Sequence, residues 1–291
     1  MNARGDRRLA WLLLAPALGL LAVVTLYPVV RVVWLSLERR VPVFGIAEFV
    51  GLANYAFLAR DGAFGTALRV TVVFTVVSVA VELVLGVAGA LALRAQRRWQ
   101  GASLSLLLLP WCLPGVVTGR IFEWIYHPTA GLVNRVALAL VGVQPNWLGD
   151  PRLALPALIV ADVWRTTPFI ALLVYARLAT VPPAVYEAAA VDGAGPAASF
   201  WRITLPLLLP VLLVALLFRV LDALRAFDLM FVLTGGGPAG VTETLTLYAY
   251  RSLFQTLQLG LGAAAGVVVG ALVVAVAWWH LAAAGASDAR A

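Results

Sequence analysis

Long apolar runs separated by short connections dominate the sequence. Six of them are long enough for a helix to cross a bilayer: residues 10–34, 67–93, 104–126, 153–178, 207–233 and 259–283. Because hydrocarbon offers backbone groups no hydrogen-bond partner, each run must close its hydrogen bonds within a helix. The sequence therefore predicts an all-α integral membrane protein with six transmembrane helices. An even number of crossings places both termini on one side of the membrane.

Composition excludes several function classes. The 21 basic residues are all arginine, so the chain lacks the lysine that a phosphate-binding P-loop requires. The chain therefore cannot hydrolyse ATP by that route, and we predict no enzymatic activity here. One cysteine, Cys112, and two distant histidines, His127 and His280, predict neither a disulfide nor a metal site. The arginines behind the net charge of +7 fall mostly between apolar runs, which argues against nucleic-acid binding.

The distribution of arginines predicts the orientation. Cytoplasmic loops of membrane proteins are enriched in basic residues. One face holds nine arginines in tight clusters: Arg4, Arg7, Arg8, Arg94, Arg97, Arg98, Arg177, Arg202 and Arg290. The other face holds seven: Arg39, Arg40, Arg60, Arg69, Arg135, Arg152 and Arg251. We therefore predict that both termini are cytoplasmic.

The apolar runs also divide the chain. Residues 1–66 are predicted to form a first transmembrane helix and an outer-face segment. The amino-terminal stretch has the basic and apolar regions of a secretory signal, but no A-x-A-like cleavage site follows it, so we interpret it as an uncleaved span. Residues 67–283 predict a transmembrane core that contains a cytoplasmic loop at 180–206. Residues 284–291 form a short tail.

The cytoplasmic loop differs from the rest of the chain. Pro182 and Pro183 suit the first turn of a helix, alanines follow, and Gly193 suits a left-handed stop. Two interpretations fit this alanine-rich helix. It docks into a groove of a soluble partner, with Glu187 and Asp192 facing basic residues there, or it rests on the membrane surface.

Four fixed features in this loop resemble the EAA signature of permeases in ATP-binding-cassette importers. They are Glu187-Ala188-Ala189, Gly193 after three residues, Ile203 after nine more, and Leu205-Pro206 after one more. Further stretches resemble the carbohydrate-uptake branch: FVGLANY at 49–55, LLLLP at 106–110, VWRTTPF at 163–169 and TGGGP at 234–238. The resemblance implies the type I importer permease fold and a sugar permease of the maltose, trehalose or glycerol-phosphate type.

In that family the loop helix enters a cleft of the ATPase subunit and passes its closure to the transmembrane helices. The resemblance implies that the following residues couple this chain to the ATPase: Glu187, Ala188, Ala189, Asp192, Gly193, Ile203, Leu205 and Pro206. A β-branched residue at Gly193 is expected to uncouple transport, because such residues disfavour a positive φ.

The resemblance also implies the assembly. A second permease chain forms a heterodimer with this one, two ATPase subunits hold ATP and Mg, and an extracellular or periplasmic solute-binding protein delivers the sugar. This chain itself holds no cofactor. The expected location is the bacterial or archaeal plasma membrane, where the multi-pass chain contacts lipid and moves a disaccharide such as trehalose or maltose by alternating access.

Charged residues inside the fifth apolar run need an explanation, because intramembrane charge is costly. Arg219, Asp222, Arg225 and Asp228 alternate in sign at steps of three, where neighbours on a helix meet. They either line the translocation path or join helices in a structural ion network. Arg165, in the fourth run, fits either interpretation. Trp164 and Phe169 are candidate aromatic contacts for a sugar ring.

The outer loop TGGGP allows the backbone to approach another surface closely. It is either a plain loop or a contact for the solute-binding protein through Gly235, Gly236, Gly237 and Pro238. One departure from the family is Leu261, which stands where an aromatic residue is usual.

A passive channel or facilitator for small polar solutes is the alternative function. It also explains six spans with buried charges, but it has no need of a cytoplasmic docking helix.

Overall fold

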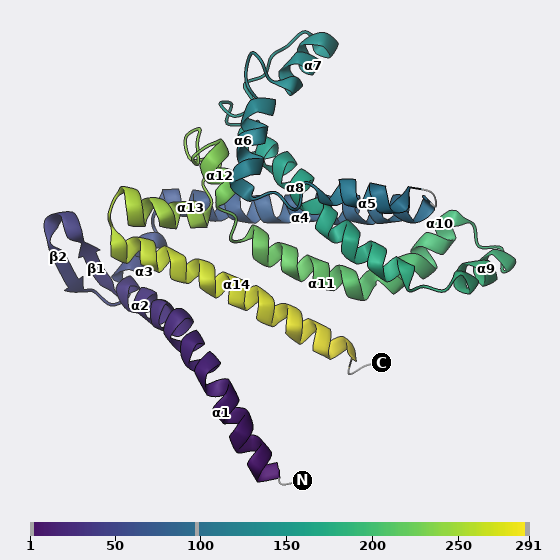
Figure 1. The fold of residues 1–291 in the computed structure, drawn as a ribbon. Helices are drawn as coiled ribbons and strands as arrows, with labels where there is room; N and C mark the ends of the chain where they lie inside the picture. Colours follow the sequence, from purple (N-terminus) through teal and green to yellow (C-terminus); the bar gives the residue numbers. More distant parts are fainter. Residues whose placement is uncertain (1–2, 97–98, 289–291) are drawn as a thin grey trace. The chain divides into compact units, whose positions relative to one another are not determined.

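The computed structural model describes residues 3–96 and 99–288 and is predominantly helical (Figure 1). The chain divides into two compact units. One consists of Met1–Gly65 and Tyr248–Ala271, and the other of Thr66–Leu247 and Leu272–Ala291. Arg97, Arg98 and Arg290 of the predicted cytoplasmic set lie outside the described residues, as do residues 289–291 of the predicted tail.

Within the described ranges, five helices are long and apolar enough to cross a membrane. They are Leu13–Ser36, Gly62–Ala95, Ala154–Ala179, Pro196–Ala223 and Leu259–Ala282. Five of the six predicted runs are thus confirmed as long apolar helices, and the third run, 104–126, is built differently.

The first unit begins with a continuous helix made of α1 (Ala3–Leu21), the π-helical turn η1 (Ala22–Leu26) and α2 (Tyr27–Ser36). A β-hairpin follows, in which β1 (Glu38–Val41) pairs antiparallel with β2 (Ile46–Phe49). The connection is the 3-10 turn η2 (Pro42–Phe44) and Gly45, whose φ of +66° suits glycine. The hairpin therefore follows the first span directly.

Helix α3 (Ala53–Leu58) holds the hairpin in place. Asn54 Nδ2 donates to the carbonyl oxygens of Ser36 and Glu38 at 2.7 and 2.9 Å. A Cβ on Gly260 would overlap the Glu38 carbonyl, so only glycine permits this approach. The remaining elements reaching this unit are α13 (Leu245–Tyr250), the π-helical turn η4 (Arg251–Gln255) and α14 (Leu259–Asp288).

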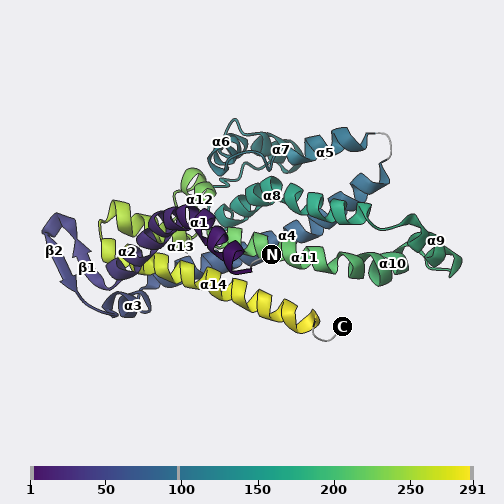
Figure 2. The same ribbon diagram turned by 60° about the horizontal axis from the view of Figure 1, so that its bottom comes forward.

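The second unit is built on α4 (Gly62–Ala95), α8 (Ala154–Ala179) and α11 (Leu205–Ala223). Helices α8 and α11 pack along each other (Figures 1 and 2). Buried residues from all three helices form one apolar core: Ala90, Ile170, Val174, Leu178, Leu208 and Ala215. Where α4 meets α8, a Cβ on Gly86 would lie 2.6 Å from Ile170 Cγ2, so this glycine sets how closely the two helices pack.

The prediction of one unbroken helix over 104–126 is wrong. Helix α5 (Gln100–Leu108) ends before Pro110, and α6 (Gly115–Ile125) begins after Pro114, whose ψ of 146° is extended. Proline lacks the N–H that continues a helix and disfavours the helical conformation at the preceding residue. Pro110 and Pro114, four positions apart, therefore replace the middle of the run by a turn.

The predicted helix over 207–233 also ends early. Helix α11 stops at Ala223, and a separate helix, α12 (Asp228–Leu233), lies against α6. The Ala226 carbonyl in the break accepts bonds from Thr244 Oγ1 at 3.1 Å and Thr246 Oγ1 at 2.6 Å. Two threonines 18 and 20 positions away thus satisfy the Ala226 carbonyl, which has left the helix.

Three further helices and one turn complete the second unit. They are α7 (Leu132–Val141), α9 (Pro183–Val191), α10 (Pro196–Ser199) and the π-helical turn η3 (Phe200–Thr204). Helix α10, η3 and α11 run on continuously, so the fifth span starts well before Leu205.

Candidate functional site

A buried ion cluster joins the three core helices. Arg219 of α11 donates Nε to Glu82 Oε2 at 2.6 Å and Nη2 to Glu82 Oε1 at 2.9 Å, so the pair is bidentate. Arg219 Nη2 also lies 3.0 Å from Asp162 Oδ2, and its Nη1 lies 2.6 Å from Asp222 Oδ2. Glu82 is fully buried, and Arg219 is only 3% exposed. One guanidinium therefore donates hydrogen bonds to carboxylates from α4, α8 and its own helix.

Helix α8 completes the cluster. Arg165 Nη2 donates to Asp162 Oδ1 at 3.2 Å. Thr166 Oγ1 lies 2.7 Å from Glu82 Oε1 and 2.6 Å from the Asp162 carbonyl, so its single hydrogen can serve either acceptor. The acids thus keep partners even where lipid surrounds the helices.

Sequence reasoning missed Glu82, the most deeply buried member. It is the only acidic residue within the predicted run 67–93. An isolated charge in such a run needs a partner, which is a usable signal. Its partner lies 137 positions away, so the residue gives no indication of which arginine it meets.

The four predicted charges of the fifth run do not form one ladder. Arg219 and Asp222 form an ion pair at 2.6 Å, as the spacing indicates. Arg225 donates Nε to the Leu221 carbonyl at 3.0 Å and, among the described residues, has no carboxylate at ion-pair distance. Asp228 starts α12 and packs on Gly115 of α6. The helix break after Ala223 separates the two halves of the ladder.

A cavity of about 240 Å³ lies over the cluster. Its walls combine aromatic rings with charged groups and one hydroxyl: Trp111, Phe169, Phe218, Arg165, Arg219, Asp222, Arg225 and Thr166. The rings of Trp111 and Phe169 stack with centroids 5.6 Å apart, and Phe218 meets Phe169 edge-on. Aromatic faces beside hydrogen-bonding groups are the arrangement that binds sugar rings.

A second, smaller cavity of about 140 Å³ brings the other charges together. Its lining includes Asp162, Arg165, Asp222, Arg225 and Asp228. Six of the seven predicted path residues, all except Trp164, therefore line one or both of these cavities, together with Trp111, Phe218 and Asp162. Trp164 does not line either cavity; its ring packs edge-on against Phe122 at 5.4 Å.

The loop at 180–206 has the predicted helix and stop. Helix α9 runs from Pro183 to Val191, and Gly193 has a φ of +78° with nothing near the position of a Cβ. Glu187, Ala188 and Asp192 are exposed, whereas Ala189 is buried. Ile203 lies in η3, and Leu205 and Pro206 form the start of α11.

The TGGGP segment at 234–238 folds onto itself. Thr242 Oγ1 donates to the Gly237 carbonyl at 2.6 Å and lies 2.7 Å from Thr234 Oγ1. Gly235 and Gly236 both have positive φ, but Gly235 is exposed and Gly236 is buried. Only part of the segment is available to a partner.

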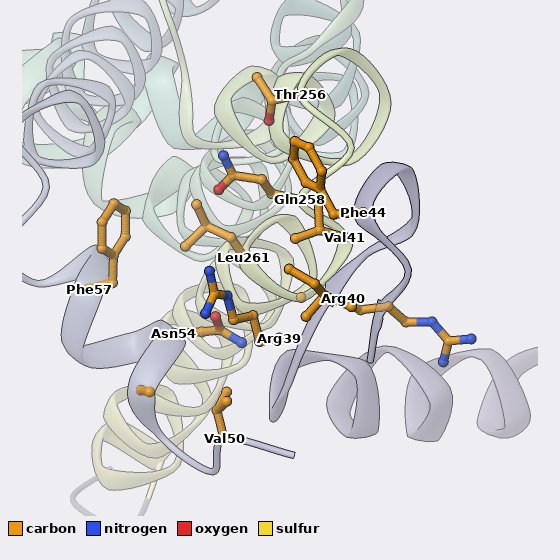
Figure 3. A pocket seen from close by; sticks show the side chains of 13 residues that line it. Arg39, Arg40, Val41, Phe44, Val50, Asn54, Phe57, Thr256, Gln258 and Leu261 are labelled. Carbon is orange, nitrogen blue, oxygen red and sulfur yellow. The ribbon is translucent and has the colours of Figure 1, made fainter. Parts of the chain in front are cut away.

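The first unit contains its own cavity of about 460 Å³, between the hairpin, α3 and the start of α14. Figure 3 shows Arg39 extending toward Asn54 and Leu261, while Arg40 points away from them. Arg40 is paired with Glu38 at 3.3 Å. Leu261, the departure from the family pattern, lines this cavity and not the one above the ion cluster.

Comparison with known proteins gives concordant results. Residues 82–284 match the family described as binding-protein-dependent transport system inner membrane component. The trehalose/maltose transport system permease protein MalF of Thermococcus litoralis is 41% identical over 270 residues, which cover 92% of this chain and 91% of that protein. The sulfoquinovosyl glycerol transport system permease protein SmoG of Agrobacterium fabrum is 41% identical over 94% of this chain and 89% of that protein.

The fold matches a solved structure over nearly its full length. That structure is a bacterial alginate ABC transporter in complex with an alginate pentasaccharide-bound periplasmic protein. One of its chains aligns with a TM-score of 0.84 over 96% of both chains, at 20% identity. At 20% identity, this similarity shows a shared fold only.

Proposed function

Because this chain belongs to the family of binding-protein-dependent transport system inner membrane components, we propose that it is the sugar-translocating permease subunit of an ATP-driven importer. Its membership of this family and its type I importer permease fold agree with the resemblance of residues 187–206 to the EAA signature. The chain is a multi-pass membrane protein of this class. The facilitator alternative is not favoured, because every similarity points to an ATP-driven system.

The proposed substrate is a glucose disaccharide such as trehalose or maltose. A permease 41% identical to this chain is named for these sugars. The cavity of Trp111, Phe169 and Phe218, with three arginines and Asp222 around it, is the observation that carries the proposal, since it offers ring faces and hydrogen-bonding groups together.

The proposed assembly has further chains. The cavity of about 240 Å³ is below the roughly 300–1,000 Å³ of typical ligand pockets, which supports a second permease chain supplying the other wall. Two ATPase subunits, holding ATP and Mg, bind at α9 through the coupling residues around Glu187 and Gly193. A solute-binding protein delivers the sugar at the opposite face, with the exposed part of TGGGP as one contact. Both termini lie in the cytoplasm.

In this scheme the membrane subunit works by alternating access. ATP draws the ATPase subunits together, α9 moves with them, and the core helices change the side to which the cavity opens. The ion cluster keeps α4, α8 and α11 together during that movement.

Uptake by the complete importer in proteoliposomes tests the function. We expect labelled trehalose or maltose to accumulate only with ATP inside and the solute-binding protein outside. Trp111→Ala should raise KM roughly tenfold, because stacking on a ring contributes about 0.5–1.5 kcal/mol beyond area burial. Trp124→Ala is the control, since Trp124 is 71% exposed on α6 and lines neither cavity.

Two results would contradict the proposal. Uptake that proceeds equally without ATP would establish the facilitator instead. A solute-binding protein that binds an amino acid or an inorganic anion would remove the sugar assignment and leave the permease assignment standing.

A further inference from the structure

Tyr186 connects α9 to the long helices. Arg94 Nη1 donates to the Tyr186 hydroxyl at 3.1 Å, and Arg94 Cζ lies 4.5 Å from the centre of the Tyr186 ring. The same hydroxyl lies 3.2 Å from Thr204 Oγ1. One side chain of α9 thus makes a cation–π contact and two hydrogen bonds.

The two partners of Tyr186 belong to different long helices. Arg94 is in the last turn of α4. Thr204 is the buried last residue of η3, immediately before α11, and its hydroxyl also lies 3.3 Å from the Ser199 carbonyl. The Tyr186 hydroxyl therefore bridges the ends of α4 and α11.

Helices α4 and α11 are joined a second time by Glu82 and Arg219. Glu82 lies about 18 Å along α4 from Arg94, at 1.5 Å per residue. Links at two separate heights prevent the helices from sliding or rotating independently, and the apolar core between them is closely packed. A displacement applied at the Tyr186 end therefore moves α4 and α11 as one body.

The opposite surface of α9 is free to meet another protein. Glu187 and Ala188 are exposed, and Val191 is 88% exposed, which is unusual for an apolar side chain without a partner. Helix α9 thus has one surface for docking and one side chain that holds it to the core.

We propose that Tyr186 is a positioning residue that passes the displacement of α9 to α4 and α11. The inference rests on the proposed function, because the ATPase subunits supply the displacement.

The test compares tyrosine variants in the complete reconstituted importer. Tyr186→Phe keeps the ring over Arg94 and removes both hydroxyl contacts. We expect sugar transported per ATP hydrolysed to fall roughly fivefold to thirtyfold, because the variant loses one charge-assisted hydrogen bond from Arg94 and one neutral hydrogen bond with Thr204. Co-purification with the ATPase subunits should stay unchanged, and the unfolding temperature should stay within a few degrees of the parent. Tyr175→Phe, the same chemical change on the partly buried Tyr175 of α8, is the matched control and should have no effect.

A second variant separates this role from a general structural one. Thr204→Val removes the other end of the bridge and also the contact of the Thr204 hydroxyl with the Ser199 carbonyl. Because the two variants share the loss of the Tyr186–Thr204 contact, the loss of coupling in the double variant should be smaller than the product of the two single losses. Effects that multiply in the double variant, an unchanged ratio of transport to ATP hydrolysis, or a loss of ATPase binding would each overturn the role of Tyr186. If the unaltered chain neither binds ATPase subunits nor couples uptake to ATP, the proposed function itself fails.

Discussion

At the residue scale, Arg219 is the common partner of the buried ion pairs between the long helices. The charges at 219 and 222 take part in an ion network that includes Glu82 and Asp162, and the same residues form a wall of the aromatic cavity. At these positions, the two interpretations of the sequence, a structural ion network between helices and a lining of the translocation path, are therefore compatible. Arg225 belongs to the cavity walls without being held by a carboxylate in the described chain.

This difference predicts unequal effects of removing the two arginines. Arg219→Met leaves Glu82 buried without its positive partner, and breaking a buried pair costs about 3–5 kcal/mol. We expect the free energy of unfolding to fall by that order, seen as a lower unfolding temperature in detergent, together with loss of transport.

Arg225→Met is the matched control for stability. It should leave the unfolding temperature within a few degrees of the parent and lower only the transport rate. Equal destabilisation by both substitutions would show that the cluster around Arg219 is not the structural centre of these helices.

At the scale of single elements, the loop after α9 depends on one backbone conformation. Gly193 has a φ of +78° and open space around the position of a Cβ, so any cost of a side chain arises from the backbone alone. Gly195, two residues on, has a φ of −69° and is equally open.

The two glycines provide a paired prediction. Gly193→Val should cost about 1–3 kcal/mol in the loop and reduce ATP-driven uptake about tenfold, because a β-branched residue resists positive φ. Gly193→Asn should retain most activity, since asparagine tolerates this region. Uptake in proteoliposomes measures both, and Gly195→Val should behave like the parent. If Gly193→Val were as active as Gly195→Val, the conformation of this loop would not matter for coupling.

At the scale of the whole molecule, the broken third run raises the question of how the chain crosses the membrane. Helices α5 and α6 are each too short to span hydrocarbon alone, which needs about 20 residues. If they cross together, residues 127–152 lie outside and α9 lies inside.

Cysteine labelling from each side of the membrane checks this topology. In a Cys112→Ser background, single cysteines replace three exposed residues: Ala47 in the hairpin, Val143 after α7 and Ala184 in α9. An impermeant maleimide should label the first two from outside and the third only in inverted vesicles. Labelling of Val143→Cys from inside would mean that α5 and α6 form a re-entrant pair and that the predicted six crossings are wrong.

Much of this protein could be predicted because it depends on short stretches of sequence. Lipid requires helices of a certain length, so apolar runs located five long helices within a few residues at most ends. The EAA signature and the glycine stop are likewise local, and they led to the family and to the conformation of Gly193. Pro110 and Pro114 are also local features, and the turn that they impose on the third run does not follow from its apolar pattern alone.

The sequence by itself thus determined the membrane-spanning helical architecture, the family and the position of the helix and glycine stop between residues 180 and 206. Only the tertiary structure decided that Arg219 pairs with Glu82, that Tyr186 bridges Arg94 and Thr204, and that Trp111 joins Phe169 at the cavity. These contacts link residues up to 137 positions apart. The reason is physical: a helix satisfies its own backbone, whereas a buried charge or hydroxyl must find a partner on whichever helix packs beside it.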